Sequence, residues 1–121
     1  MRIITDIFIL LVAIEALLIM LMEIWGSNQQ LAKAFDLELD YLKQPAARVA
    51  MSNQGLYNGF IGVGLLISRY FLPTNSQAIV CLLFTGFVVV AAIWGSVTAK
   101  NFKILFVQGF PALIATLLLL S

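Results

Sequence analysis

The sequence has no histidine, one cysteine, three prolines and few charges, with seven Lys or Arg and six Asp or Glu among 121 residues. Histidine is the commonest metal ligand and a frequent general base, so its absence argues against a metal site, a resident cofactor and most enzymatic mechanisms. The single Cys81 excludes a disulfide framework. A net charge of +1, with no basic patch among aromatic residues, argues against a nucleic-acid partner. We therefore expect a protein that is not an enzyme and that holds no metal or cofactor.

Apolar residues are what the sequence has in abundance, at 62% of the chain against 11% charged residues. A soluble domain carries about a quarter charged residues, so the charges here are too few to cover a soluble globule. We expect membrane lipid to be the partner of most of the surface. Four spans of about 20 residues fit into this length together with one longer loop. The predicted fold class is all-α, an integral membrane four-helix bundle that forms a single domain over residues 1–121.

Uncharged stretches between charged residues predict transmembrane helices at about residues 3–25, 48–70, 77–99 and 102–120. The first differs from the others because it contains Asp6, Glu15 and Glu23. A cleaved signal peptide is the alternative for this segment. We favour a retained helix, since Glu15 interrupts the apolar stretch and no small-residue cleavage site follows it cleanly.

The longest connection, at about residues 28–44, is amphipathic. Its apolar residues recur at spacings near four and are Leu31, Phe35, Leu39 and Leu42. This period predicts a helix that lies in the plane of the membrane interface.

Basic residues predict the orientation, because loops rich in Lys and Arg stay in the cytoplasm. Five of the seven flank the first and third loops, namely Lys33, Lys43, Arg48, Lys100 and Lys103. Arg2 and Arg69 lie on the opposite side. This distribution predicts that both termini face outward.

The sequence also contains a short internal repeat. IWGS occurs at residues 24–27 and again at 93–96, and Gln-Gly followed by an apolar residue occurs at 54–56 and at 108–110. Two helical hairpins in tandem would produce this pattern. The alternative is that Trp and Gly simply favour helix ends near the membrane surface.

Glu15 lies near the middle of the first predicted span, where a charged side chain costs about 2.5 to 3.5 kcal/mol. We expect its side chain to face the interior of the bundle, where the protonated form is favoured. Glu23, eight residues later, falls on an adjoining face near the membrane surface. The two carboxyls predict a proton or cation site with Glu15 at its centre and Glu23 at its mouth. The alternative is a neutral Glu15 that only stabilises helix packing.

The second predicted span carries closely spaced polar residues, which are Asn53, Gln54, Tyr57 and Asn58. On an α-helix they form two neighbouring faces, and a third face carries Gly55, Gly59 and Gly62. The glycines predict close packing against another helix, which would bring Glu15 to the amides. We favour a polar cavity at this point over simple interhelical hydrogen bonds.

Gln108 extends this set from the fourth predicted span. Pro111 has no N–H to donate to the carbonyl of Val107, so a free carbonyl is expected near Gln108 and can point into the same cavity. The alternative is a simple kink, or a proline in the first turn of a helix that begins near Gln108.

Four segments carry a resemblance to a known family, and they are LVAIE at residues 11–15, IMLME at 19–23, NQGLYNGF at 53–60 and VQGFPA at 107–112. Together they resemble a family of small bacterial four-helix membrane proteins catalogued as a domain of unknown function, number thirteen-oh-four. The resemblance covers essentially the whole chain and implies a multi-pass protein of the bacterial plasma (inner) membrane, with no established substrate or reaction. Family members often carry a histidine after the first-helix Glu, where this chain has Ala16, which leaves Glu15 as the candidate titrating group.

The function favoured by the sequence is a binding or transport bundle, with a polar pocket for a small amphipathic or cationic ligand. The pocket would be lined by Glu15, Glu23, Asn53, Gln54, Tyr57, Asn58 and Gln108. A proton-coupled exporter similar to the small multidrug-resistance proteins is an alternative that requires a homo-oligomer, although the long first loop departs from that pattern. A structural subunit of a membrane complex is another. An enzyme acting on a lipid or isoprenoid-like substrate is the least expected.

Overall fold

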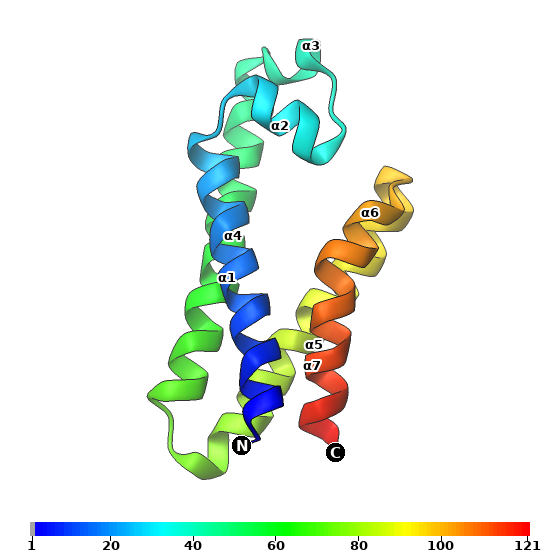
Figure 1. Ribbon diagram of the computed structural model, residues 1–121. Helices are drawn as coiled ribbons and strands as arrows, with labels where there is room; N and C mark the ends of the chain where they lie inside the picture. Colours follow the sequence, from blue (N-terminus) through cyan, green and yellow to red (C-terminus); the bar gives the residue numbers. More distant parts are fainter. Residues whose placement is uncertain (1) are drawn as a thin grey trace. The chain divides into compact units, whose positions relative to one another are not determined.

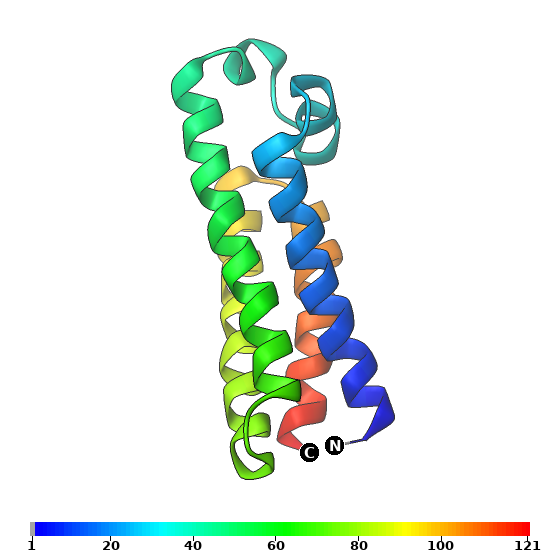
Figure 2. The same ribbon diagram turned by 90° about the vertical axis from the view of Figure 1, so that its left-hand side faces the viewer.

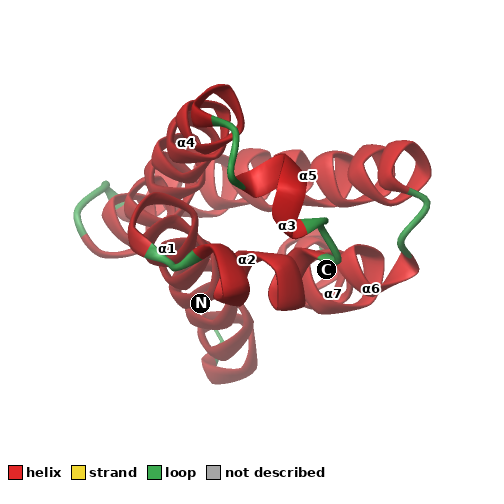
Figure 3. Cartoon of the chain, turned by 90° about the horizontal axis from the view of Figure 1, so that it is seen from above, coloured by secondary structure: helices red, strands yellow, loops and turns green. Residues whose placement is uncertain are grey.

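The structure, a computed structural model, describes residues 2–121 and is helical throughout, apart from short connections (Figures 1 and 3). No strand occurs within these residues, which confirms the all-α fold class. The elements follow in the order α1 (Ile3–Trp25), α2 (Asn28–Phe35), α3 (Leu39–Leu42), α4 (Pro45–Tyr70), α5 (Thr74–Ala99), α6 (Phe102–Ile104), η1 (Leu105–Gly109) and α7 (Phe110–Leu120).

Three helical stretches among residues 2–121 are long and apolar enough to cross a membrane. They are Ile3–Trp25, Thr74–Ala99 and Phe102–Leu120. α4 is 26 residues long but is not among them, because the amides in its first half lower its hydropathy. The assignment of residues 48–70 as a further span therefore stays a prediction.

The helices begin slightly earlier than expected at two places. α4 begins at Pro45, since a proline fits the first turn of a helix, where its missing N–H breaks no hydrogen bond. α5 begins at Thr74, three residues before the expected start of the span, and Pro73 is the residue directly before its first turn.

The chain divides into two compact units. Unit 1 comprises residues 1–15 and 62–121, and unit 2 comprises residues 16–61. Both α1 and α4 run through the two units, so each helix has one part in unit 1 and the other part in unit 2.

In unit 1, α5 packs against η1 and α7 through small side chains. Ala92 and Thr85 of α5 are buried, as are Ala112 and Ala115 of α7. The Thr116 hydroxyl donates to the Thr85 hydroxyl at 3.0 Å and joins the two helices by a hydrogen bond. Small residues let the backbones approach closely, which is how apolar helices associate when burial from water contributes little.

The last helix contains a π-helical segment, η1, directly before Pro111. The N–H of Phe110 donates to the carbonyl of Leu105, five residues earlier instead of four. The wider register accommodates a proline that cannot donate in the α-helical pattern. Gly109 in this segment lies against α5, where a Cβ would come within 3.0 Å of the Ala92 Cβ. The expected helix over 102–120 is therefore continuous but not uniform.

In unit 2, the prediction of one amphipathic helix over residues 28–44 is wrong, because the segment forms two short helices, α2 and α3. Ser27 and Gln30 form a reciprocal capping box that begins α2. Asp36 then adopts the left-handed conformation (φ 53°, ψ 44°), and the N–H of Leu37 donates to the carbonyl of Ala32 at 3.2 Å. This is the hydrogen bond of a Schellman helix end, which turns the chain before α3.

The apolar residues of this segment pack against the protein itself. Leu31 and Leu42 are fully buried and form a cluster with Met51 of α4. The side chains of Met22, Ala32, Phe35 and Leu37 pack around it. Leu39, the remaining residue of the predicted apolar face, is 41% exposed. The two helices thus form a small core of their own at the start of α4, and their location in the membrane interface stays a prediction.

The two IWGS sequences lie in different local structures. Residues 24–27 end α1 and begin α2, with Ser27 as the capping residue. Residues 93–96 lie inside α5, where Ser96 is buried and its hydroxyl donates to the carbonyl of Ala92 at 2.7 Å. The repeat has no common structural role, and the tandem arrangement of hairpins stays a prediction.

Candidate functional site

The candidate site of unit 2 is the carboxyl group of Glu23, near the end of α1. The side chain is fully buried, with an exposed fraction of 0%. Its Oε1 accepts a hydrogen bond from Nδ2 of Asn58 on α4 at 2.6 Å. Its Oε2 is also buried and has no hydrogen-bond partner among residues 2–121. One oxygen is therefore oriented by an amide, and the other is left to accept or donate a further bond.

Glycines of α4 bring the two helices together around this carboxyl. A Cβ on Gly55 would lie 2.9 Å from Cβ of Glu23 and 3.2 Å from the backbone carbonyl oxygen of Met20. A Cβ on Gly59 would overlap the Met20 side chain. Within unit 2, α1 and α4 run antiparallel, so each turn of α4 meets an earlier turn of α1 (Figure 2). Gly55 thus lies beside Glu23, and Asn58, one turn later, reaches its carboxyl.

In this register Asn58 contacts Glu23, whereas the sequence had favoured Glu15 as the partner of the amides. The physical reason is that the closest backbone approach occurs at Gly55, which faces the end of α1. Glu15 is half-buried and belongs to unit 1, whereas the amides belong to unit 2. A site shared by Glu15 and the amides stays a prediction.

No hydrogen bond joins the other predicted polar residues of unit 2 to Glu23 in the part of the chain that the structure describes. The side chains of Asn53, Gln54 and Tyr57 are exposed on α4. The Tyr57 ring is 68% exposed and contacts Phe60 edge-on, with ring centroids 5.8 Å apart. Gln108 is half-buried in η1, and Gly62 is buried in α4. Unit 2 therefore brings together only Glu23, Asn58 and two glycines of the predicted set.

Arg48 is a part of unit 2 that the sequence analysis treated only as a loop charge. Its Nη1 donates to Oδ1 of Asn28 at 2.7 Å, and its Nη2 donates to the carbonyl of Gly26 at 2.9 Å. Its Nε is buried without a partner among residues 2–121. The guanidinium thereby joins α4 to the corner between α1 and α2. This role of Arg48 could have been suspected from the sequence, because basic side chains often bind the free carbonyls at a helix end.

Unit 1 contains an ion pair that the sequence analysis also missed. The guanidinium of Arg69 at the end of α4 contacts both carboxylate oxygens of Asp6 in the first turn of α1, with Nη2 to Oδ2 at 2.8 Å. Nη1 of Arg69 also donates to Oε1 of Gln77 at 3.3 Å, and Nε2 of Gln77 donates to the carbonyl of Leu72 at 2.9 Å. A bidentate pair of this kind fixes both side chains in one geometry.

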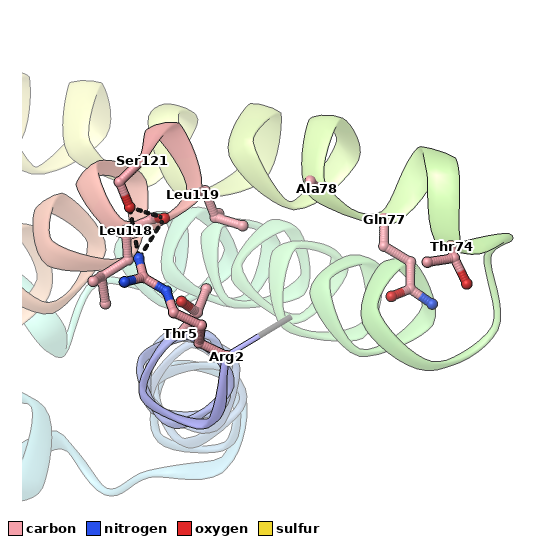
Figure 4. A pocket seen from close by; sticks show the side chains of 8 residues that line it. All are labelled: Arg2, Thr5, Thr74, Gln77, Ala78, Leu118, Leu119 and Ser121. Carbon is pink, nitrogen blue, oxygen red and sulfur yellow. Dashed lines mark hydrogen bonds between the residues drawn. The ribbon is translucent and has the colours of Figure 1, made fainter.

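A cavity of about 260 Å³ opens at one end of unit 1, between the first turns of α1 and α5 and the last turn of α7 (Figure 4). Its lining is Arg2, Thr5, Thr74, Gln77, Ala78, Leu118, Leu119 and Ser121. Nη2 of Arg2 donates to Oγ of Ser121 at 2.6 Å and to the carbonyl of Leu118 at 3.4 Å.

Comparison with known proteins places the chain in a family. It is 34% identical over 116 residues to the uncharacterized protein YpaA of Lactococcus lactis subsp. lactis (strain IL1403), with 95% of each chain covered. No solved structure matches it. The family described as "Protein of unknown function (DUF1304)" matches residues 10–120. This match includes Glu23, Asn58 and the glycines between α1 and α4, and it confirms the resemblance noted in the sequence, so the chain belongs to the DUF1304 family of proteins of unknown function.

Proposed function

We propose that this protein is a multi-pass protein of the bacterial plasma membrane that binds a proton or a small cation at the Glu23–Asn58 pair. The observation that carries the proposal is the buried Oε2 of Glu23, which has no partner among residues 2–121, beside an Oε1 held by Asn58. This carboxyl takes the role that the sequence assigned to Glu15 as the centre of the site.

The energetics of burial support a bound proton or cation. A buried charged oxygen without a hydrogen bond is strongly unfavourable. A proton or a cation on Oε2 removes most of that penalty, and Asn58 holds the carboxyl in one orientation while the exchange takes place. Acidic side chains inside membrane segments commonly mark ion or proton sites.

The proposed architecture is a four-helix bundle of α1, α4, α5 and the helix over 102–120. α4 supports this, because 26 residues extend about 39 Å and the hydrocarbon core is about 30 Å thick. The amides of α4 are acceptable in a membrane if they are paired, as Asn58 is with Glu23. The Lys and Arg distribution favours both termini outside.

Carbodiimide labelling tests the site, because dicyclohexylcarbodiimide reacts with protonated carboxyls in apolar surroundings. We expect wild-type protein in detergent to gain one adduct that peptide mapping assigns to Glu23. Sodium, methylammonium or tetraphenylphosphonium should slow the reaction if that cation binds. Glu23→Gln should lose this adduct, whereas the matched variant Glu15→Gln should keep both the adduct and the protection. Labelling of Glu23 that no cation slows and that does not vary with pH would overturn the proposal.

The exposed amides of α4 favour a second candidate function, a subunit of a homo-oligomer or of a larger membrane complex. Asn53, Gln54 and Tyr57 are exposed, and amides in contact with lipid are unfavourable unless a partner helix pairs with them. Light scattering in detergent should then give a mass above that of one chain. The double change Asn53→Leu and Gln54→Leu should reduce that mass to one chain. A single-chain mass for wild-type protein would argue against this candidate.

A further inference from the structure

We infer that the cavity at the end of unit 1 binds the phosphate of an anionic phospholipid headgroup. The inference rests on the proposed membrane location, but it concerns a different place in the molecule from Glu23. The cavity is lined by one cationic side chain, by hydroxyl and amide groups, and by an apolar wall. Each of these three features matches one part of a phospholipid.

The cationic side chain is Arg2, which reaches over the cavity from the first residues of the described chain (Figure 4). Both of its hydrogen bonds to residues 2–121 leave from Nη2, toward Ser121 and the carbonyl of Leu118. A guanidinium carries five N–H donors in a fork that matches phosphate geometry. Donors on Nη1 and Nε are thus left for an anion in the cavity.

The nearest acidic side chain does not cancel the charge of Arg2. Asp6 lies one helical turn after Arg2, where the two could pair along the helix. Both oxygens of Asp6 are instead bound by Arg69, which lies on α4. The Asp6–Arg69 pair therefore leaves the Arg2 guanidinium as the charged group of the cavity lining.

The start of α5 adds a second source of positive potential. Thr74 is the first residue of this 26-residue helix and lines the cavity. Pro73 precedes it, and no side chain caps the backbone N–H groups of the first turn. The first turn of a long helix favours anions. Thr5, which is 2% exposed, adds a buried hydroxyl from α1.

The apolar wall selects a lipid over a free anion. Ala78, Leu118 and Leu119 line the cavity beside the polar groups. A free phosphate ion makes no use of such a wall, whereas the glycerol and upper acyl chain of a lipid do. The cavity is smaller than the roughly 300 to 1,000 Å³ of sites that enclose a drug-sized molecule, so it fits a headgroup with the chains outside. The ends of three apolar helices meet here, at the level of a membrane interface under the proposed architecture.

The test compares retention of two lipids that differ in net charge. Full-length protein in detergent is mixed with equal amounts of phosphatidylglycerol and phosphatidylcholine, and the bound lipids are counted by native mass spectrometry. Wild-type protein should prefer phosphatidylglycerol, and Arg2→Gln should lower that preference about tenfold. The control Lys103→Gln removes an exposed cation beside the other end of α5 and should leave the preference unchanged.

Three results would overturn the inference. They are an unchanged preference in Arg2→Gln, an equal loss in Lys103→Gln, and full displacement of the lipid by millimolar inorganic phosphate, which would assign the cavity to free phosphate. Ser121→Ala separates a helix-capping role of Arg2 from lipid binding. If Arg2 only caps α7, Ser121→Ala and Arg2→Gln lower thermal stability alike and neither changes lipid preference. Extraction of the protein from membranes by alkaline carbonate would refute the membrane proposal itself, independently of these measurements.

Discussion

Glu23 and Asn58 are 35 positions apart in the chain, and a hydrogen bond of 2.6 Å joins the amide of one to the carboxyl of the other. The bond links the last turns of α1 to the middle of α4 and occurs where Gly55 lets the two backbones approach. A fully buried carboxyl, a single amide donor and a glycine contact therefore form one local arrangement.

Substitution of Glu23 should show how much its hydrogen bond with Asn58 contributes to the free energy of unfolding. Glu23→Ala leaves the Asn58 amide unpaired and opens a cavity, so we expect a loss of about 2 to 4 kcal/mol in unfolding free energy. Glu23→Gln keeps an acceptor for Asn58 and should lose less than about 1 kcal/mol. Unfolding in detergent, followed by circular dichroism, measures both. Equal losses in the two variants would show that the hydrogen bond contributes nothing.

Gly55→Ala should separate α1 from α4. The new Cβ would lie 2.9 Å from Cβ of Glu23, and the nearby Met20 carbonyl belongs to the backbone and cannot rotate away. We expect a destabilisation of about 1 to 3 kcal/mol. The matched control is Gly86→Ala in α5, where nothing lies within 4 Å of the added atom, and it should be neutral or stabilise by up to about 1 kcal/mol. Similar effects in both variants would contradict the close approach.

Arg48→Lys should loosen the corner between α1 and α2 while keeping the charge. An ammonium group cannot reproduce the fork that binds Asn28 and the carbonyl of Gly26 together. We expect amide hydrogen exchange over residues 26–31 to accelerate about tenfold. Lys43→Gln is the control, because that side chain is 67% exposed and its contact with Asp40 lies on the surface. Unchanged exchange in Arg48→Lys would show that only the charge matters.

The Asp6–Arg69 pair should show strong coupling in a double-mutant cycle. Asp6→Asn and Arg69→Gln each leave a largely enclosed partner, since the two side chains are only 24% and 20% exposed. We expect a coupling energy of about 1 to 3 kcal/mol, measured by unfolding of the two single variants and the double variant. Additive losses would mean that the contact contributes no more than an exposed surface pair.

Much of the secondary structure was predictable from charge and hydropathy. α1 has the bounds expected for the first span, and the helical stretch over 102–120 was expected in full. The break at Asp36 was not, because the apolar period continues across it and a left-handed aspartate is a much weaker signal than a glycine. Leu31 and Leu42 fit the predicted period and yet lie on different helices.

The acid in the candidate site was harder to predict than the helices. Glu15 was chosen as the central acid because it lies in the middle of the predicted span. Which acid pairs with an amide depends instead on the axial register of the two helices. That register follows from side-chain contacts at Gly55 and Gly59, which a helical wheel does not contain. Arg48 and Asp6 were visible in the sequence only as charges at the ends of spans.

The π-helical segment changes how the end of the chain should be compared with other sequences. Each residue of an α-helix advances by about 100°, so one extra residue in a turn rotates everything after it by about that angle. Side chains on opposite sides of Leu105–Gly109 therefore share a face at spacings one larger than usual. A one-residue gap near Gln108 in an alignment would mark a relative whose last helix is α-helical throughout and lacks the π-helical segment. The residues of that relative aligned with 110–120 would then present a different face to the helix that corresponds to α5.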